Sequence, residues 1–365
     1  MKLFLSEEKT NLGRQREIDY AKVIAIFFMV LIHVWEELSY FDCFETVPEG
    51  FWHNLLQFGA GPLAAPLFMF AMGVGICYSS HRSPEEFAKR GIQLFLIGYA
   101  LNFCRNGIYY AIYCRTHGIW NLNELVYLSF NGDILHFAGL TFLLVAFFKK
   151  CRMSVLTMGG VAVVMQIAGY LLSQYVPVSE GWSYIIGHLY YAENCCFPLL
   201  QWFVYPAAGI IFAKYLRHIT GKDDFYRSVM GISAVLLLGL CSALSFAGYN
   251  IQNFYILTGD IYYQQEFFHS IFTLLVILIE LSLLYFITKN INVKAINNTV
   301  NYISSRLNNI YIIQWMLVGT ASFVVMMADL DDLKAGPAIL VGIVFVVLSV
   351  LISRLYDRIR SAIRK

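Results

Sequence analysis

The chain has 365 residues, of which 58% are hydrophobic and only 14% are charged, and its mean hydropathy is +0.60. A soluble domain carries about a quarter charged residues, so this composition excludes an ordinary water-soluble protein. It indicates an integral membrane protein, and the net charge of +2 gives no reason to expect a nucleic-acid partner.

Ten stretches of the chain are long and apolar enough to cross roughly 30 Å of hydrocarbon as helices. They are too long and too continuously apolar for the alternating strands of a membrane barrel. We therefore predict an all-α integral membrane protein, a bundle of about ten transmembrane helices over residues 18–38, 62–80, 89–108, 133–148, 154–174, 198–216, 229–248, 267–288, 308–327 and 336–354.

The distribution of basic residues predicts the orientation of this bundle. Of the 26 Lys and Arg, all but Arg105, Arg115 and Lys334 fall on the side that holds both termini. Cytoplasmic loops are enriched in Lys and Arg, so we expect both termini in the cytoplasm and the basic tail on the lipid of the inner leaflet. The first span follows a charged segment and lacks a small-residue exit, so we expect an anchor rather than a cleaved signal.

We find no internal repeat and no separate soluble domain, so we expect residues 1–365 to form a single domain. The longest outer loops, 39–61, 109–132 and 175–197, are expected to contain short re-entrant or amphipathic segments. Four cysteines fall on the outer side, where an oxidising environment allows a disulfide whose pairing the sequence does not define: Cys43, Cys114, Cys195 and Cys196.

The first span contains ionisable residues on one helical face. In DYAKVIAIFFMVLIH (Asp19–His33), His33 follows Lys22 by eleven residues, which is close to three full helical turns and a rise of roughly 16 Å. Asp19 lies one turn before Lys22, and Glu36 and Glu37 lie one turn after His33. Ionisable groups inside a membrane are costly and often functional.

Two interpretations of this face remain open. In the functional one, Lys22 binds an anionic group that enters from the cytoplasm, His33 acts as a general base, and Glu36 or Glu37 fixes its tautomer. In the structural one, Asp19 and Lys22 form an interfacial ion pair and His33 is a packed histidine bonded to a neighbouring helix.

The same stretch resembles the first helix of the transmembrane acyltransferase superfamily. In the acyltransferase-3 branch of that superfamily, an Arg is followed by ten residues and a His, and here Lys22 and His33 have that spacing. Lys in place of Arg is a departure, because Lys lacks the bidentate fork that suits phosphate or carboxylate.

Five further stretches, in order, resemble the catalytic domain of heparan-α-glucosaminide N-acetyltransferase and its bacterial relatives. Together with the first helix they extend the resemblance over about residues 16–320. It implies transfer of an acyl group from cytosolic acyl-CoA to an acceptor, usually a sugar, across the membrane. The stretches are APLFMFAMGVG (Ala65–Gly75), KRGIQLFLIGY (Lys89–Tyr99), GDILHFAGLTFLL (Gly132–Leu144), FPLLQWFVYPAAGIIFAK (Phe197–Lys214) and RLNNIYIIQW (Arg306–Trp315).

The resemblance also suggests a rival for the catalytic base. The eukaryotic enzymes place a catalytic histidine in the outer loop before the second helix, and His53 lies near that place. Its structural alternative is an interfacial loop residue beside Trp52. We rank His33 first and His53 second.

Four other polar residues are candidates for the site. Asp133 and His136 share a helix face, with a helix N-cap and a wall position as their structural alternatives. Arg105 would hold an acceptor carboxylate or counter Asp133. Gln314 would hydrogen-bond the ligand or link two helices.

The donor would be bound by basic residues at the inner mouth of the bundle, namely Lys22, Arg16, Lys89 and Arg90, although the cytoplasmic excess of Lys and Arg alone would explain their presence. We expect no metal, because His33 and Glu36 would be only two ligands.

We therefore predict a multi-pass acyltransferase of a bacterial cell membrane. Its donor would be acyl-CoA, in particular acetyl-CoA, and it would O- or N-acylate an extracytoplasmic sugar of a glycan or glycolipid. Membrane lipid would surround the protein. One alternative is a transporter or flippase for a lipid-linked or acidic small molecule. Another is a non-catalytic partner of a cell-surface assembly.

Overall fold

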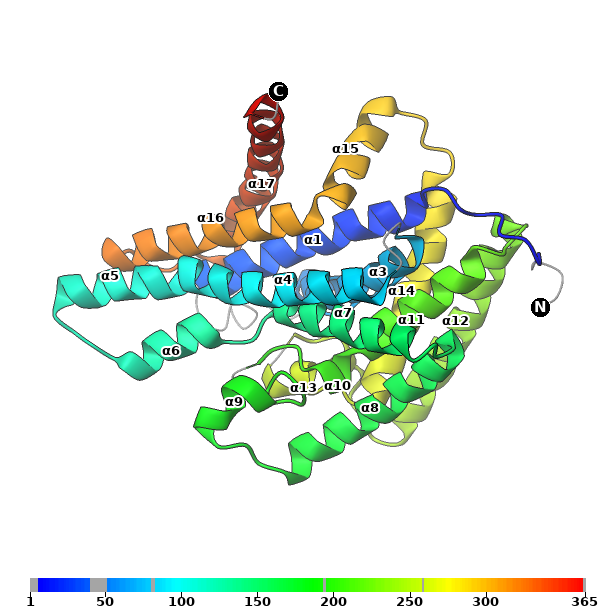
Figure 1. Cartoon of the computed structure of the whole chain (residues 1–365), viewed down its shortest axis with the longest axis horizontal. Helices are drawn as coiled ribbons and strands as arrows, with labels where there is room; N and C mark the ends of the chain where they lie inside the picture. The colour runs from blue at the N-terminus through cyan, green and yellow to red at the C-terminus, as the bar shows by residue number, and fades with distance from the viewer. Residues whose placement is uncertain (1–5, 40–50, 80–82, 193–194, 258, 364–365) are drawn as a thin grey trace. The chain divides into compact units, whose positions relative to one another are not determined.

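The computed structural model describes residues 6–39, 51–79, 83–192, 195–257 and 259–363. Within these residues the chain is helical, and isolated bridges join Ser39 to Leu333 and Gly132 to Cys195. The elements are α1 (Arg16–Leu38), α2 (Phe51–Ala60), α3 (Ala65–Tyr78), α4 (Pro84–Asn102), η2 (Phe103–Gly107), α5 (Ile108–His117), α6 (Leu122–Phe130), α7 (Ile134–Lys150), α8 (Val155–Tyr175), α9 (Glu180–Ile186), α10 (Leu199–Trp202), α11 (Val204–Leu216), α12 (Lys222–Phe246), η3 (Ile251–Phe254), α13 (Gly259–Gln264), α14 (Phe267–Thr288), α15 (Lys294–Ser305), α16 (Leu307–Met327) and α17 (Ala335–Ile363) (Figure 1).

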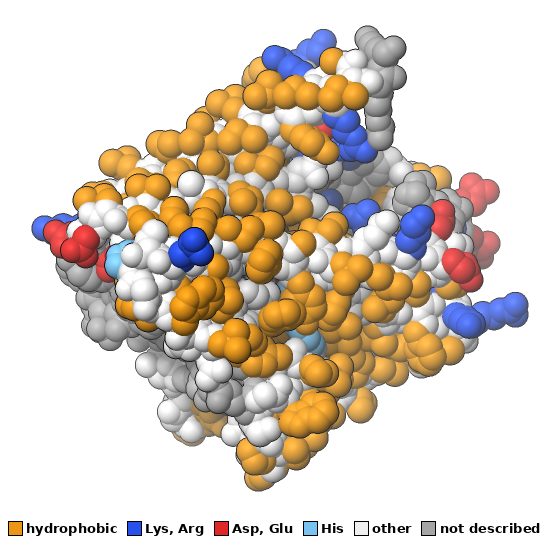
Figure 2. All heavy atoms as spheres, turned by 60° about the vertical axis from the view of Figure 1, so that its left-hand side comes forward, with side chains coloured by type: hydrophobic (Ala, Val, Ile, Leu, Met, Phe, Trp, Pro, Cys, Tyr) orange, Lys and Arg blue, Asp and Glu red, His pale blue; other side chains and the backbone are white. Residues whose placement is uncertain are grey.

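The helical membrane class is confirmed. In the described ranges, eight helices are long and apolar enough to cross a membrane: 16–38, 54–78, 155–175, 199–216, 222–246, 267–288, 307–327 and 336–363. Figure 2 shows hydrophobic side chains over wide areas of the displayed surface, as lipid contact requires. The orientation of the termini stays a prediction.

Two of the ten predicted spans form helices that fall short of this standard. The helix α7 has 17 residues, and α4 carries Glu85, Glu86, Lys89 and Arg90 in its first two turns. The predicted span 89–108 does not coincide with one α-helix, because α4 ends at Asn102 and the π-helix η2 follows directly. Eight of the ten predicted spans therefore meet this standard within the described residues.

The chain forms two compact units, each assembled from three separate segments. Unit 1 comprises 1–21, 61–98 and 132–292, and unit 2 comprises 22–60, 99–131 and 293–365. Two of the boundaries fall inside α1 and α4, so each of these continuous helices belongs partly to both units.

Unit 1 is built around the close packing of α3 against α11. A side chain at Gly73 would lie 2.1 Å from the carbonyl oxygen of Pro206, and one at Gly209 would lie 2.1 Å from that of Phe70. Glycine at both positions therefore lets the two backbones approach closely, as small residues do between membrane helices. In the same unit, α8 packs against α10 and α11, and α12 packs against α14.

Polar contacts join the first helix of unit 1 to α12. Glu17 is buried, and its Oε1 accepts hydrogen bonds from Lys222 Nζ at 2.8 Å and Tyr226 OH at 2.7 Å. Asp19 forms an ion pair with Arg14. A buried carboxylate needs such donors to offset its desolvation, so these residues have a structural explanation.

Unit 2 contains residues 22–38 of α1, the end of α4, the π-helix η2, and helices α2, α5, α6 and α15–α17. The helix α16 packs against α17, η2 and α5. A side chain at Gly319 on α16 would lie 2.4 Å from the carbonyl oxygen of Arg105, so glycine allows η2 to lie directly on α16. The amide of Leu333 donates to the carbonyl of Leu38 at 2.8 Å.

Short helices occupy the segments that we predicted as long outer loops. The described parts of these segments contain α2, α5, α6 and α9. All seven described cysteines are free thiols, so no disulfide joins Cys114, Cys195 and Cys196, and Cys43 lies outside the described residues.

Candidate active site

The predicted base, His33, lies in α1 and is bonded to α16 of the same unit. Its Nδ1 lies 3.2 Å from Oε1 of Gln314, a side chain that is 0% exposed. An amide oxygen only accepts hydrogen bonds, so this contact places the proton of neutral His33 on Nδ1. Nε2 then keeps its lone pair, which is the state that a general base requires.

Two aromatic residues of α16 hold the imidazole in place. The Trp315 ring stacks on His33, with centroids 3.9 Å apart and an interplanar angle of 25°. Tyr311 meets the same imidazole edge-on, at 6.0 Å between centroids. Both rings are buried, so His33 is oriented by packing as well as by its hydrogen bond.

A cation lies beside this aromatic group. The guanidinium carbon of Arg105 is 3.5 Å from the centroid of a Trp315 ring, a cation–π contact, and Arg105 is only 8% exposed. Arg105 belongs to the π-helix η2. A π-helical turn re-phases the side chains of a helix and is frequent at functional sites.

Together these side chains form the candidate active site: His33, Arg105, Tyr311, Gln314 and Trp315. The site offers one imidazole nitrogen for a proton and one buried positive charge for an anion. This combination suits attack by a hydroxyl or an amine on a carbonyl, where a proton is lost and negative charge develops.

The other predicted site residues on the α1 face do not contact the His33 imidazole in this way. Glu36 is exposed and Glu37 is half-buried, and the side chain that bonds the imidazole is Gln314 rather than either glutamate. Lys22 is half-buried in the same helix. His53 lies in α2, and its side chain lies outside the described residues.

Asp133 and His136 lie in unit 1, where they form a capping box at the start of α7. Asp133 Oδ1 accepts from the amide of Leu135 at 2.7 Å, and His136 Nδ1 accepts from the amide of Asp133 at 3.0 Å. The structural alternative for Asp133, an N-cap, is thus confirmed. His136 is 0% exposed.

A second histidine, which the sequence did not single out, lies beside His136. The imidazole centroids of His136 and His188 are 5.2 Å apart, and His188 Nδ1 is 3.5 Å from Cys195 Sγ. Burial, followed by the nearby His136, lowers the pKa of His188 to about 4, whereas Asp133 opposes the shift. His188 therefore stays neutral at physiological pH.

The predicted donor-binding residues of unit 1 are exposed. Arg16 donates to the carbonyl of Ile291 at 3.3 Å. Lys89 and Arg90 lie on α4, where the Arg90 guanidinium lies 5.2 Å from the ring centroid of Phe142. Among the described residues, no three His, Cys, Asp or Glu side chains converge to hold a metal ion.

Tyr311 and Trp315 were missed as site residues, although a signal was present. In RLNNIYIIQW they lie four residues apart and therefore on one helix face, and Gln314 precedes Trp315. An aromatic pair at this spacing is ordinary in a membrane helix. Only its contact with His33 in the structure identifies it as part of the site.

Comparison with known proteins identifies the family. The family model for heparan-alpha-glucosaminide N-acetyltransferase, catalytic, matches residues 14–254. The match includes His33, Arg105 and the first four motif stretches, and ends before Arg306–Trp315. The search of curated proteins finds no match. The chain belongs to the family of the heparan-alpha-glucosaminide N-acetyltransferase catalytic domain, which is a family of membrane acetyltransferases.

Proposed function

We propose that this protein transfers an acetyl group from cytosolic acetyl-CoA to a sugar on the far side of a bacterial cell membrane. The observation that carries the proposal is the hydrogen bond from His33 Nδ1 to Gln314, which leaves the second nitrogen of a half-buried imidazole free to accept a proton. Membership of an acetyltransferase family supports the reaction class.

The reaction is direct transfer. The hydroxyl or amine of the acceptor attacks the thioester carbonyl, and His33 Nε2 takes the proton that the acceptor loses. The carbon–sulfur bond then breaks, and the coenzyme A thiolate leaves and takes up a proton. This route needs no acyl-enzyme, in agreement with the burial of Cys195, which raises the pKa of its thiol and keeps it protonated.

Arg105 supplies the positive charge of the site. It lies against Trp315, and Trp315 stacks on His33, so its charge is near the nitrogen that removes the proton. We propose that Arg105 stabilises a carboxylate of the acceptor or the negative charge that develops on the thioester oxygen. A buried guanidinium is effective in this role because water does not screen it.

The basic residues at the predicted inner mouth would bind the donor. Lys22 lies on the same helix as His33, roughly 16 Å from it along the axis. We propose that Lys22 meets a phosphate of coenzyme A, and that Arg16, Lys89 and Arg90 add positive charge for the remaining phosphates.

The decisive experiment measures transfer of labelled acetyl from acetyl-CoA by protein in lipid vesicles. One arm offers an oligosaccharide that ends in α-glucosamine, and the other offers the N-acetylated form, so that amine and hydroxyl acceptors are distinguished. A positioned general base contributes about 10²–10⁴-fold, so His33→Ala is expected to lower kcat by that factor while acetyl-CoA still binds.

Two variants serve as controls. His117→Gln changes an exposed histidine of the same unit and should leave the rate unchanged, and His53→Ala tests the rival base and should cost less than His33→Ala. If the His33 variant transfers at a near-normal rate, or is inactive only because it is unfolded, His33 is structural and the mechanism is wrong.

A further inference from the structure

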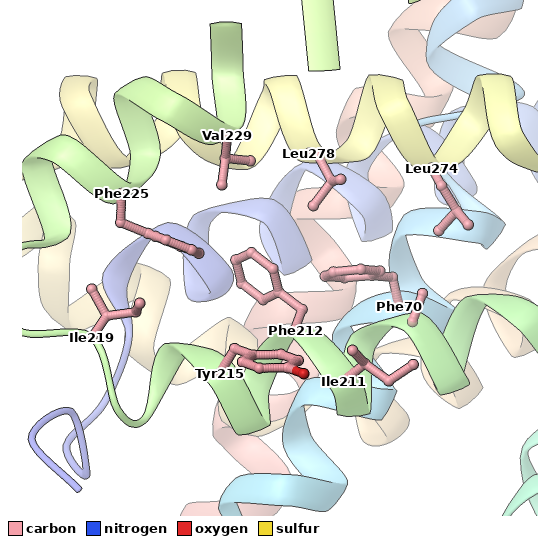
Figure 3. Close-up of a pocket in the computed structure, with 10 residues that line it drawn as sticks. Phe70, Ile211, Phe212, Tyr215, Ile219, Phe225, Val229, Leu274 and Leu278 are labelled. Carbon is pink, nitrogen blue, oxygen red and sulfur yellow. The ribbon is translucent and has the colours of Figure 1, made fainter. Parts of the chain in front are cut away.

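An apolar cavity of about 390 Å³ lies within unit 1 among α3, α11, α12 and α14. Figure 3 shows side chains from all four helices turned toward this common space. Phe70 comes from α3, Ile211 and Phe212 from α11, Phe225 from α12, and Leu274 and Leu278 from α14. None of the described residues that line the cavity carries a charge, so water would find almost no hydrogen-bonding partners there.

The helices around this cavity belong to segments that are long and apolar enough to cross a membrane, and α12 exposes large apolar side chains. Five large hydrophobic residues of α12 are more than half exposed: Ile232, Val235, Leu236, Leu238 and Phe246. Ile211, Phe225, Leu274 and Leu278 are themselves only partly buried, so the cavity opens outward. In a bilayer this opening faces hydrocarbon chains, which are the one abundant apolar solvent at that depth.

A second hollow, which contains a lysine, adjoins this cavity at Tyr215. Tyr215 lines both the cavity and this second hollow of about 260 Å³, whose lining includes Lys214, His218 and Ser6. Lys214 is exposed. His218 Nδ1 lies 3.1 Å from the carbonyl oxygen of Ser6 and donates to it. No acidic residue is among the described residues that line this hollow.

We propose that this pair of spaces binds a membrane phospholipid with an anionic headgroup. One acyl chain fills the cavity between α3, α11, α12 and α14, and the phosphate lies at Lys214 and His218. The ring of Tyr215, which has one apolar body and one hydroxyl, lies at the junction, where such residues are typical of a lipid interface. The proposal does not depend on the acetyl-transfer mechanism, whose residues lie elsewhere.

An apolar space that adjoins a cation at Tyr215 favours a lipid over another occupant. A helix of a second copy would need an apolar face and would gain nothing from Lys214. Another apolar hollow of unit 1, of about 500 Å³, lies along α8 and is lined by residues that include Val161, Val164, Met165 and Ala168. The described residues of its lining include no Lys, Arg or His. That hollow is the matched comparison, because any boundary lipid could enter it.

The test uses the full-length protein in phosphatidylcholine nanodiscs with a trace of photoactivatable lipid. The probe carries a diazirine in one acyl chain and either a phosphatidylglycerol or a phosphatidylcholine headgroup, and labelled peptides are mapped by mass spectrometry. Phosphatidylglycerol should label α11, α12 and α14 about fivefold more than phosphatidylcholine, since one Lys near an anionic membrane surface contributes about 1 kcal/mol. Labelling of α8 should not depend on the headgroup.

Paired variants separate the two halves of the site. Lys214→Ala should abolish the headgroup preference, Lys214→Arg should keep it, and Lys150→Ala, an exposed lysine at the end of α7, should not affect it. Ala208→Phe fills the cavity and should remove the labelling, whereas Ala168→Phe in the other hollow should not. Leu274→Phe repeats the test if Ala208→Phe fails to fold.

Three outcomes would overturn the proposal. Equal labelling by both headgroups would mean ordinary boundary lipid, and an unchanged preference in Lys214→Ala would mean a different headgroup site. Cross-linking between two protein chains through α11 or α14 would mean that a second copy covers the cavity.

Discussion

At the scale of single residues, the contacts of His33 explain why a histidine lies near the end of an apolar run. An imidazole within a membrane span is costly unless it is bonded, and Gln314 and Trp315 provide a hydrogen bond and a stacking partner. These contacts satisfy the structural interpretation of His33, and they also give the orientation that a base needs. The two interpretations therefore describe one arrangement, and only rate measurements separate them.

Removal of the Gln314 amide is expected to lower the transfer rate without weakening donor binding. When His33 takes the proton, its bond to Gln314 becomes charge-assisted, which contributes about 1.5–3 kcal/mol, or roughly tenfold to a hundredfold in rate. Gln314→Leu should lose this factor in kcat, with KM for acetyl-CoA unchanged. Gln314→Glu restores an acceptor oxygen and should recover part of the rate. An unchanged kcat in Gln314→Leu would contradict the assigned tautomer.

His188 is expected to make folding sensitive to acid. Its pKa is lowered from 6.5 to about 4, so between these values the unfolded chain binds a proton that the folded chain does not. Stability should therefore fall as the pH falls from 6.5 toward 4, by up to about 1.4 kcal/mol per pH unit, and should show no further loss from this group below 4.

The measurement compares unfolding midpoints of wild type and His188→Asn at pH 7, 5.5 and 4.5. The difference between them should shrink or reverse as the pH decreases, because the variant lacks the titrating ring. His117→Gln, at an exposed histidine, should follow the wild type. Parallel curves for wild type and His188→Asn would show that the buried imidazole does not titrate in this range.

At the scale of elements, the π-helix η2 packs against α16 and thereby positions Arg105, the cation of the candidate site. This close packing requires glycine at residue 319, which lets the backbone of Arg105 lie against α16. The α4, η2 and α5 elements follow one another without a break from Pro84 to His117, so the π-helical turn changes the direction of Arg105 without ending the helix.

Gly319→Ala is expected to destabilise the protein and to lower transfer. The new Cβ would lie 2.4 Å from the Arg105 carbonyl oxygen, which is backbone and cannot rotate away, and overpacking of this kind costs about 1–3 kcal/mol. The control is Gly231→Ala in α12, where a Cβ meets nothing within 4 Å and helix propensity favours alanine by up to about 1 kcal/mol. If the two variants unfold at the same midpoint, the close approach of η2 to α16 is not tight in solution.

At the scale of the whole molecule, the distribution of charge predicts which ends of the helices face the cytoplasm. Single cysteines in a cysteine-free background, treated with a membrane-impermeant maleimide from outside, test this orientation. Trp182→Cys, in the segment between α8 and α10, should react. Glu85→Cys and Ser361→Cys, at the start of α4 and in the tail, should react only after the membrane is permeabilised. Labelling of the tail from outside would contradict the predicted ten-span topology with cytoplasmic termini.

The sequence by itself determined the properties that depend on local composition and period. Low charge and long apolar runs identify a helical membrane protein, and the spacing of Lys22 and His33 places both on one face of α1, because a helix repeats every 3.6 residues. The ordered motifs identified the acetyltransferase family, which the match over residues 14–254 confirms. The ends of the spans were harder to predict, since the π-helix after Asn102 divides a stretch that the sequence presents as one span.

Only the tertiary structure decided which side chains surround His33. Gln314 lies 281 residues away along the chain, and Arg105 reaches the same tryptophan from a third element. Periodicity fixes the face of each helix but not the neighbour that the face meets, because that choice depends on how the α1, η2 and α16 surfaces pack. For the same reason the sequence counted Asp133 as a catalytic and His136 as a substrate-binding candidate, whereas packing in unit 1 gave them a capping box and a buried neighbour in His188.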